Sequence, residues 1–340
     1  MNVGQNSSFL LILSASTAAL LLTSLFFEGT HKQANYEEAA EVVSINPPRG
    51  WVEDGKVEII LTGDVMLGRT VMTKSLDLGD PTYPFKKVAE RLRSADLVFV
   101  NLENPIVEDC PRHYEGFKFC ADPKMVEGLV FAGVDVVNLA NNHTLNYGHA
   151  GLDETKKILG ENGIAVTGVN NLPDRQAGLT MKQLKNATFG FLGFNFVENG
   201  PSEEDLNLVY EAKESVDVLI VGVHWGVEYT DKPTTNQREW ARELVEAGAD
   251  VIAGHHPHWI QDVEQVGQIH TRGAGINPPE GWKSVPVYYS LGNFVFDQMW
   301  SEKTRRGMVV ELIFDGKQLI SQQSHKTYMS SWAQPEFLTK

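Results

Sequence analysis

Three short strings contain residue types that could do chemistry. Each places an Asp, Asn or His directly after a run of strand-forming apolar residues, and the strings are 62–66, 140–143 and 254–258. The carboxyl ends of strands meet at one rim of an open α/β sheet, which is where such folds hold their sites. Carboxylate, amide and imidazole groups converging there indicate a metal centre rather than a serine or cysteine nucleophile.

Taken singly, each candidate donor has a structural explanation. Asp64 could cap a helix, the Asn141-Asn142-His143 turn could exploit the tolerance of Asn for left-handed geometry, and His224 could be a buried structural histidine. The His-His-Pro-His turn at 255–258 has the least packing reason to be histidine-rich. With Glu103 added and no cysteine present, the set predicts one or two divalent ions such as Mn, Zn, Fe or Mg, which would activate a water and clamp a phosphoryl-like centre.

These residues must be positioned by alternating strands and helices. Buried strands are expected at 57–61, 97–100, 134–139, 189–194, 216–223, 250–253 and 285–289, and helices at 83–94, 123–132, 149–162, 202–215 and 235–247. From 262 onward strand follows strand, at 262–266, 293–296, 308–314 and 318–322. Repeated βα units with a β-rich end predict an α/β protein, a layered α/β sandwich with mixed sheets.

The amino terminus has a different composition. Residues 9–27 carry no charge, and this segment has about the length of a transmembrane helix. A cleavable signal peptide is the rival interpretation, but no Lys or Arg precedes the run and no small-x-small site follows it. We therefore expect an uncleaved signal anchor over 1–28, a linker over 29–55, one domain over 56–322 and a tail over 323–340.

Composition and cysteine usage narrow the partners and the compartment. The 340 residues are 42% hydrophobic, enough for a sizeable core, and the net charge of -15 argues against nucleic acid and a bare anionic bilayer as electrostatic partners. Cys110 and Cys120 share one polar stretch. They could close a disulfide outside the cytoplasm or remain two free thiols, and the apolar amino terminus favours the disulfide.

The ordered motifs resemble the bacterial poly-gamma-glutamate capsule biosynthesis family of CapA type, whose fold is similar to calcineurin-like metallophosphoesterases. The resemblance covers about 57–314 and is carried by segments 63–69, 101–103, 141–143, 222–226, 256–261 and 289–298. It implies a single-pass protein of the cell membrane with an outward-facing domain. The implied partners are other membrane subunits of a polyglutamate synthase complex, the anionic polymer, and the membrane itself through the N-terminal helix.

The same resemblance implies roles for individual residues. It assigns Asp64 and His258 to a first ion and Glu103 to a bridging position, with a second ion on Asn142, His224 and His256. His143 would be the acid beside the leaving group or the oxyanion donor, with Asp64 also in the catalytic set. The expected substrate ligands are Asn293, Arg305 and Arg306, although the two arginines could equally lie in a solvated loop. His255 is expected to be a neighbour of the ligands.

Three positions depart from the phosphoesterase pattern. Met66 stands where a ligand histidine is usual, Glu103 replaces an Asp, and Asn146 replaces an Asp that follows the Asn-His pair. The first ion site is therefore expected to have one ligand fewer. Three hypotheses follow: a component of capsule synthesis or export, a metal-dependent envelope hydrolase of phosphoesters or amides, and a non-catalytic polymer- or subunit-binding module.

Overall fold

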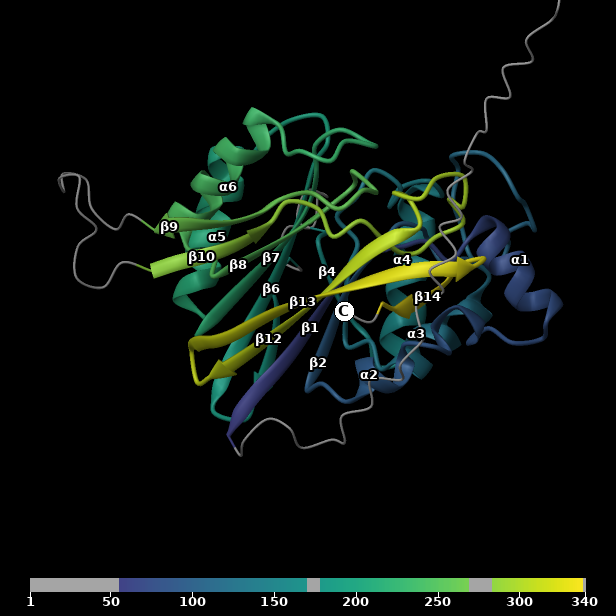
Figure 1. Ribbon diagram of the computed structural model, residues 1–340, viewed down its shortest axis with the longest axis horizontal. Helices are drawn as coiled ribbons and strands as arrows, with labels where there is room; N and C mark the ends of the chain where they lie inside the picture. The colour runs from purple at the N-terminus through teal and green to yellow at the C-terminus, as the bar shows by residue number, and fades with distance from the viewer. Residues whose placement is uncertain (1–54, 170–177, 269–282, 339–340) are drawn as a thin grey trace, which may run out of the picture. The chain divides into compact units, whose positions relative to one another are not determined.

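The computed structural model describes residues 55–169, 178–268 and 283–338 (Figure 1). The expected anchor at 1–28 and nearly all of the linker at 29–55 lie outside these residues. Within the described ranges, no helix is both long enough and apolar enough to cross a bilayer.

Two β-sheets form the centre of the described region. The first has the order β14-β13-β12-β1-β2-β3-β4, with β11 also paired to β1. Its strands are β1 (Lys56–Val65), β2 (Leu97–Leu102), β3 (Val136–Asn138), β4 (Ala165–Thr167), β11 (Asn293–Val295), β12 (Arg306–Asp315), β13 (Gln318–Ser331) and β14 (Gln334–Phe337). β1 to β4 run parallel, whereas β12, β13 and β14 are antiparallel.

The second sheet has the order β5-β6-β7-β8-β10-β9. Its strands are β5 (Thr180–Leu184), β6 (Ala187–Phe196), β7 (Val218–Trp225), β8 (Val251–His255), β9 (Val263–Gln268) and β10 (Lys283–Tyr288). The four strands β6, β7, β8 and β10 are parallel, and the outer two pair antiparallel with their neighbours. Both sheets are therefore mixed, as the sequence predicted.

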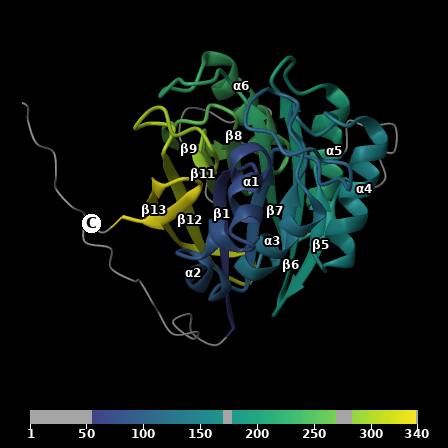
Figure 2. The same ribbon diagram turned by 90° about the vertical axis from the view of Figure 1, so that its right-hand side faces the viewer.

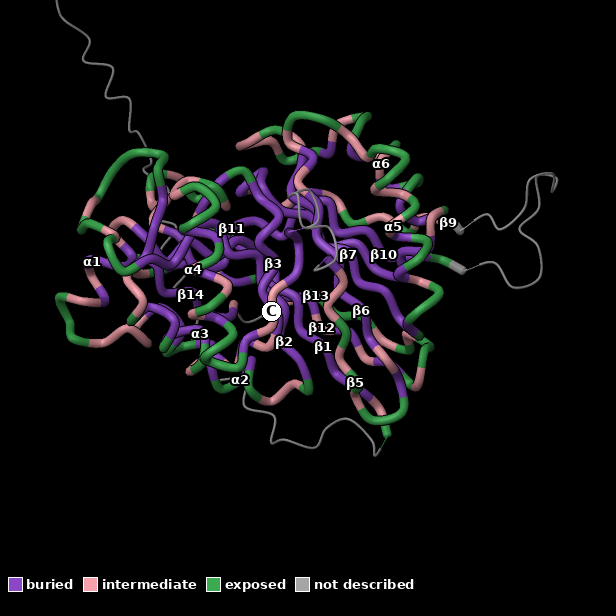
Figure 3. The backbone as a smooth tube through the Cα atoms, turned by 180° about the vertical axis from the view of Figure 1, so that it is seen from behind, coloured by how far each residue is buried: buried purple, intermediate pink, exposed green. Residues whose placement is uncertain are grey.

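Alternation along the strands builds three cores. Ile59 and Leu61 of β1 face the second sheet, while Ile60 between them faces the helices. Between the sheets, the rings of Phe99 and Phe191 stack with centroids 5.7 Å apart. Because both faces of these strands are covered, their sequences are apolar throughout rather than alternating. Figure 3 shows the central strands buried along most of their length.

Helices cover the two outer faces. The first sheet packs on α1 (Arg69–Asp77), α2 (Ala89–Arg93), α3 (Val126–Ala132) and α4 (Gly148–Glu161), and the second on α5 (Glu203–Glu214) and α6 (Thr235–Ala247). Two 3-10 turns, Tyr83–Phe85 and Pro123–Met125, complete the helical segments. Figure 1 shows the resulting order of layers, helix, sheet, sheet, helix, and Figure 2 looks onto the helices of the first sheet. The predicted layered sandwich is confirmed.

Local signals explain where the later helices begin and end. The Ser202 side chain accepts from the Asp205 N–H while Asp205 accepts from the Ser202 N–H, and Thr234 and Gln237 form the same capping box at α6. Gly248 ends α6 with a φ of 127°, a conformation that favours glycine. The helices expected at 202–215 and 235–247 are thus confirmed.

The predicted tail at 323–340 is wrong, because residues up to Phe337 belong to the first sheet. β13 pairs with β12 from Gln318 to Tyr328, and Thr327 to Ser331 then pair with β14. Residues 323–326 are exposed or half-buried polar groups, so no apolar run signals that the strand expected at 318–322 continues. Backbone pairing to β12 holds these residues in the sheet without that signal. Helix α1 and strand β5 were also not foreseen, and the alternating exposure of β5 marks it as an edge strand.

Register brings the motif strings together. Asp64 pairs with Asn101 of β2 and Asn293 of β11, and His224 pairs with His255. Gly63 permits the close packing of β1 against the segment before β11, since a Cβ at position 63 would lie 2.1 Å from the Gly292 carbonyl oxygen. The strand-end polar groups of both sheets are therefore fixed by backbone pairing.

Candidate metal centre

Two buried carboxylates form the middle of the site. Donor atoms of Asp64, Glu103 and His224 all lie within 4.8 Å of one another. Asn101 Nδ2 donates to Asp64 Oδ1 at 2.9 Å and to Glu103 Oε1 at 3.2 Å. Glu103 Oε2 is buried and has no hydrogen-bond partner among the described residues. A buried carboxylate oxygen without a partner is costly, and a bound cation would satisfy it.

His258 completes the first group of donors. Its Nδ1 lies 3.2 Å from Asp64 Oδ2 and 2.9 Å from Asn293 Oδ1, so this nitrogen carries the hydrogen and donates to both oxygens. His258 Nε2 is left with its lone pair, 4.0 Å from Glu103 Oε2. An imidazole whose far nitrogen is held by a carboxylate and an amide is oriented as metal ligands usually are.

Asn293 does not lie where a substrate ligand is expected. The side chain is buried, and its Nδ2 donates to Gln298 Oε1 and to the Thr304 carbonyl. With Oδ1 on His258, every polar atom of the amide has a protein partner. The structure therefore corrects the expected role: Asn293 stands behind His258 and orients its ring.

A second group of donors lies beside the first, with Asn142 following β3 of the first sheet, and His224 at the end of β7 and His256 directly after β8 of the second. His224 Nε2 lies 3.1 Å from Asn142 Oδ1, and the His224 and His256 ring centroids are 4.8 Å apart. His256 has a φ of 95°, an uncommon conformation for a residue with a side chain, and its N–H donates to Asp64 Oδ2 at 3.3 Å. Backbone strain of this kind clusters at functional sites. The six residues predicted to hold metal are thus brought to one place.

His255 points elsewhere. Its Nε2 lies 3.0 Å from the Thr62 carbonyl oxygen and donates to it, which ties the end of β8 to β1. Burial lowers its pKa, so the ring stays neutral. The side chain serves the fold beside the ligands, in the place expected for it.

The two carboxyl groups of the centre have pKa values shifted in opposite directions. Burial alone would raise the pKa of Asp64, but the hydrogen bond from His258 and the neighbouring imidazoles hold it well below its ordinary value. Burial and the Asp64 charge raise the pKa of Glu103 well above its ordinary value. Burial also lowers the pKa of His224 and brings that of His256 to about 4. Neutral imidazoles are the form that binds metal.

The donor chemistry fits a divalent ion. Carboxylate, amide and imidazole groups suit Mn, Zn, Fe or Mg, and the described residues place no thiolate near the centre. Cys110, His113 and Cys120 also lie close together, but the two cysteines form a disulfide and therefore offer no thiolate to a metal. Met66 supplies no imidazole: its Sδ accepts the Gly68 N–H at 3.1 Å, in the turn before α1.

His143 lies at the edge of these donors, directly after Asn142. Asn146 Oδ1 accepts the Phe119 N–H at 2.6 Å, which fixes the orientation of that amide. His143 Nδ1, 3.2 Å from the same oxygen, must therefore donate to it. Burial lowers the pKa of His143 to about 4, so the neutral ring keeps Nε2 unprotonated.

Arg305 and Arg306 face β13. Arg305 Nε donates to the Met329 carbonyl at 2.9 Å, and both guanidinium groups lie over the Tyr328 ring and near Glu302. Their contact with a substrate stays a prediction.

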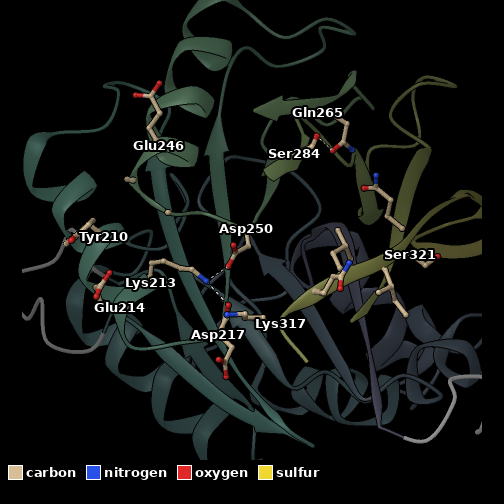
Figure 4. Close-up of a pocket in the computed structure, with 16 residues that line it drawn as sticks. Tyr210, Lys213, Glu214, Asp217, Glu246, Asp250, Gln265, Ser284, Lys317 and Ser321 are labelled. Atoms are coloured by element: carbon tan, nitrogen blue, oxygen red, sulfur yellow. Dashed lines mark hydrogen bonds and ion pairs between the residues drawn. The ribbon is translucent and has the colours of Figure 1, made fainter. Parts of the chain in front are cut away.

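Two hollows differ in their relation to the centre. A hollow of about 570 Å³ borders it and is lined by Asn142, Asn195 and the 197–200 loop. A larger one, of about 900 Å³, contains none of the metal donors and is lined by residues such as Lys213, Asp217 and Asp250 (Figure 4). Chemistry rather than size therefore identifies the site.

Three residues near the centre were given no role by sequence reasoning. Arg69 pairs with Asp297, and the Tyr229 ring lies 6.0 Å from that of His258, centroid to centroid. Arg69 and Asp297 lie inside the motif segments 63–69 and 289–298, which was the available signal. Their pairing depends on a contact between distant parts of the chain.

Comparison with known proteins decides the family. The profile of the family described as "Bacterial capsule synthesis protein PGA_cap" matches residues 58–298. The chain belongs to this family. It is 31% identical over 287 residues to "Capsule biosynthesis protein CapA" of Bacillus anthracis, covering 76% of this chain and 64% of that protein. It is 30% identical over 275 residues to "PGA biosynthesis protein CapA" of Bacillus subtilis (strain 168), covering 76% and 68%.

The PGA_cap chain thus spans about two thirds of the length of these relatives. Among solved structures, a hypothetical protein from Thermus thermophilus matches with a TM-score of 0.50 and 17% identity, over 79% of this chain and 98% of that one. This likeness shows a shared fold.

Proposed function

We propose that this PGA_cap protein works in the synthesis or export of a poly-gamma-glutamate capsule, with a metallophosphatase-like centre that hydrolyses a phosphoester. Family membership and the names of its relatives support the capsule role. The apolar segment 9–27 supports a single-pass anchor, and the disulfide supports an extracytoplasmic domain, since disulfides persist in oxidising compartments. The proposed partners are membrane subunits of the synthase complex and the anionic polymer.

One observation carries the catalytic part of the proposal. Both sheets deliver oxygen and nitrogen donors to one place, and there Glu103 Oε2 is buried without a partner in the described part of the chain while facing His258 Nε2 at 4.0 Å. A purely structural carboxylate would have its oxygens satisfied. This arrangement is what a bound cation requires.

The residues would divide the work as follows. Asp64 and His258 would hold a first ion, Asn142, His224 and His256 a second, and Glu103 would lie between them. Bound divalent ions lower the pKa of a coordinated water and neutralise charge on a phosphoryl oxygen. Asn101 and Asn293 keep the ligands oriented through the hydrogen bonds described above. His143, beside Asn142, would exchange a proton with the reacting group through Nε2.

A second candidate is a binding module without turnover. Met66 favours the binding module. A hydrolase would use a further imidazole ligand at this position, in the turn before α1, but Met66 offers a thioether whose sulfur already accepts the Gly68 N–H. An amide in the envelope remains the alternative substrate for a hydrolase.

The test measures metal and turnover on the full chain purified in detergent. Elemental analysis and a phosphodiester assay are applied to the unmodified protein, Asp64→Asn, His256→Gln and the matched control His325→Gln, whose histidine pairs with Glu311 on the first sheet. We expect stoichiometric metal and turnover in the unmodified protein and in His325→Gln. Both should be lost in Asp64→Asn and in His256→Gln. Metal without turnover on phosphoesters would support the binding module, and absence of metal would refute the centre.

A further inference from the structure

We infer that the loop closed by Cys110 and Cys120 positions His143, with Phe119 as the contact and Arg69 as its support. The inference rests on the proposed role of His143 in the metal centre. It assigns a function to a disulfide loop that supplies no metal donor. Phe119 and Arg69 are positioning residues, since they act through His143.

Phe119 holds His143 in two ways. The two rings stack with centroids 4.0 Å apart and an interplanar angle of 26°. The Phe119 N–H also donates at 2.6 Å to Asn146 Oδ1, the same oxygen that accepts from His143 Nδ1. One residue therefore fixes both the plane of the imidazole and the tautomer that leaves Nε2 unprotonated.

Arg69 fixes Phe119 in turn. Its guanidinium carbon lies 4.5 Å from the Phe119 ring centroid, and its Nη1 donates to the Gly116 carbonyl at 3.0 Å. Two hydrogen bonds, one of them 3.1 Å from Nε to Oδ2, tie it to Asp297. The side chains of this ion pair are only 12% and 5% exposed, so the pair is little screened by solvent. Arg69 thereby joins the start of α1, the segment after β11 and the disulfide loop.

The rest of the loop is held by its base and by a few side-chain contacts, such as Arg112 with Asp77 and Lys118 over the Tyr147 ring. Its base is held by hydrogen bonds from Val107 N–H and Ala121 N–H to the Ala121 and Pro105 carbonyls, and Tyr114 and Phe117 project into solvent. All residues from Cys110 to Cys120 are described, and none of them lies in a helix or strand. Cross-linking the ends restricts the conformations such a segment can adopt. Reduction would widen the range of positions open to Phe119.

The experiment reads the His143 ring directly. Full-length protein carrying ¹⁵N-histidine is purified in detergent and its imidazole ¹⁵N resonances are recorded, with His143 assigned through His143→Gln. We expect one Nδ1–H tautomer in the unmodified protein. Phe119→Ala keeps the backbone N–H but removes the ring that packs this residue against His143, so we expect averaged ring shifts there and in the double variant Cys110→Ser, Cys120→Ser. Phe119→Tyr should restore the single tautomer. Tyr114→Ala, at a 62% exposed residue of the same loop, is the matched control and should leave it unchanged.

Kinetics separate this inference from the proposed function. If the protein hydrolyses phosphodiesters, Phe119→Ala should lower kcat by up to about 100-fold with KM and bound metal unchanged, as for a misplaced catalytic group. Changed His143 resonances in a protein without turnover would refute the hydrolase and leave the positioning role standing. Unchanged resonances in both Phe119→Ala and the bulkier Phe119→Leu would overturn the inference whatever the activity.

Discussion

Carboxylates lie at both ends of the parallel strands, and the two groups have different partners. At the amino ends, each Asp side chain accepts a hydrogen bond from a backbone N–H on the neighbouring strand, at 2.6 to 2.9 Å. The acceptor and donor residues are Asp96 and Glu58, Asp135 and Val98, Asp217 and Thr188, and Asp250 and Leu219. At the carboxyl ends, Asp64 and Glu103 face each other and imidazoles, and one Glu103 oxygen has no partner among the residues that the structure describes.

The difference separates structural acids from functional ones. Each Asp of the first group directly precedes a strand, and its own N–H donates to the same residue that its side chain accepts from, so it staples two strands together. Figure 4 shows two of them, Asp217 and Asp250, beside Lys213. In the second group Asp64 is well supplied with hydrogen bonds, whereas burial and the Asp64 charge disfavour ionised Glu103, whose Oε2 has no partner among the described residues. Natural proteins accept this loss of stability where function needs it.

The largest expected effect comes from Glu103→Gln. Metal content should fall to background, because the residue between the two donor groups loses its charge. The metal-free protein should become more stable by about 1–2 kcal/mol at neutral pH, since burial and Asp64 both oppose ionised Glu103. Elemental analysis and urea unfolding measure the two quantities. A variant destabilised in the metal-free state would place Glu103 with the staples.

Asp250→Ala should change stability in the opposite direction. The Leu219 N–H and Lys213 Nζ lose a buried acceptor, which destabilises by about 1–3 kcal/mol. Metal content should stay unchanged, because this end of the strands holds no donor of the centre. Urea unfolding followed by circular dichroism gives the free energy. Loss of metal in a folded Asp250→Ala protein would contradict the division between the two ends.

The histidines of the centre predict a pH dependence of stability. The pKa of His256 is lowered by burial from 6.5 to about 4, so between these values the unfolded chain takes up a proton that the folded one does not. The free energy of unfolding of the metal-free protein should therefore fall as the pH drops from about 6.5 to about 4. His256→Gln should make this fall shallower, whereas His149→Gln, at an exposed residue of α4, serves as control. Parallel curves for the two variants would disprove the assignment.

Arg306→Ala should have the smallest effect on stability. The side chain is 47% exposed and lies 3.8 Å from Glu302, so the ion pair contributes less than about 0.5 kcal/mol. If Arg306 binds an anionic substrate, KM should rise severalfold with kcat and thermal midpoint unchanged. An unchanged KM would assign this residue to a solvated loop.

The sequence by itself determined the layers and the location of the centre. Apolar runs predicted most strands, helical spacing predicted the helices at 202–215 and 235–247, and polar groups at strand ends predicted one converging site. These inferences succeed because periodicity depends on neighbours in the chain. Which six residues would bind metal was implied by the family resemblance, and the fold places all six in one region.

Only the tertiary structure decided how each side chain is used. Asn293 looked like a substrate ligand and proved to be the support of His258, and residues 323–337 looked like a tail and proved to be strands. Which Glu103 oxygen lacks a partner, and that Phe119 stacks on His143, also required the fold. The physical reason is distance along the chain: Arg69 and Asp297 meet across 228 residues, and no local pattern encodes a contact that two packed segments create.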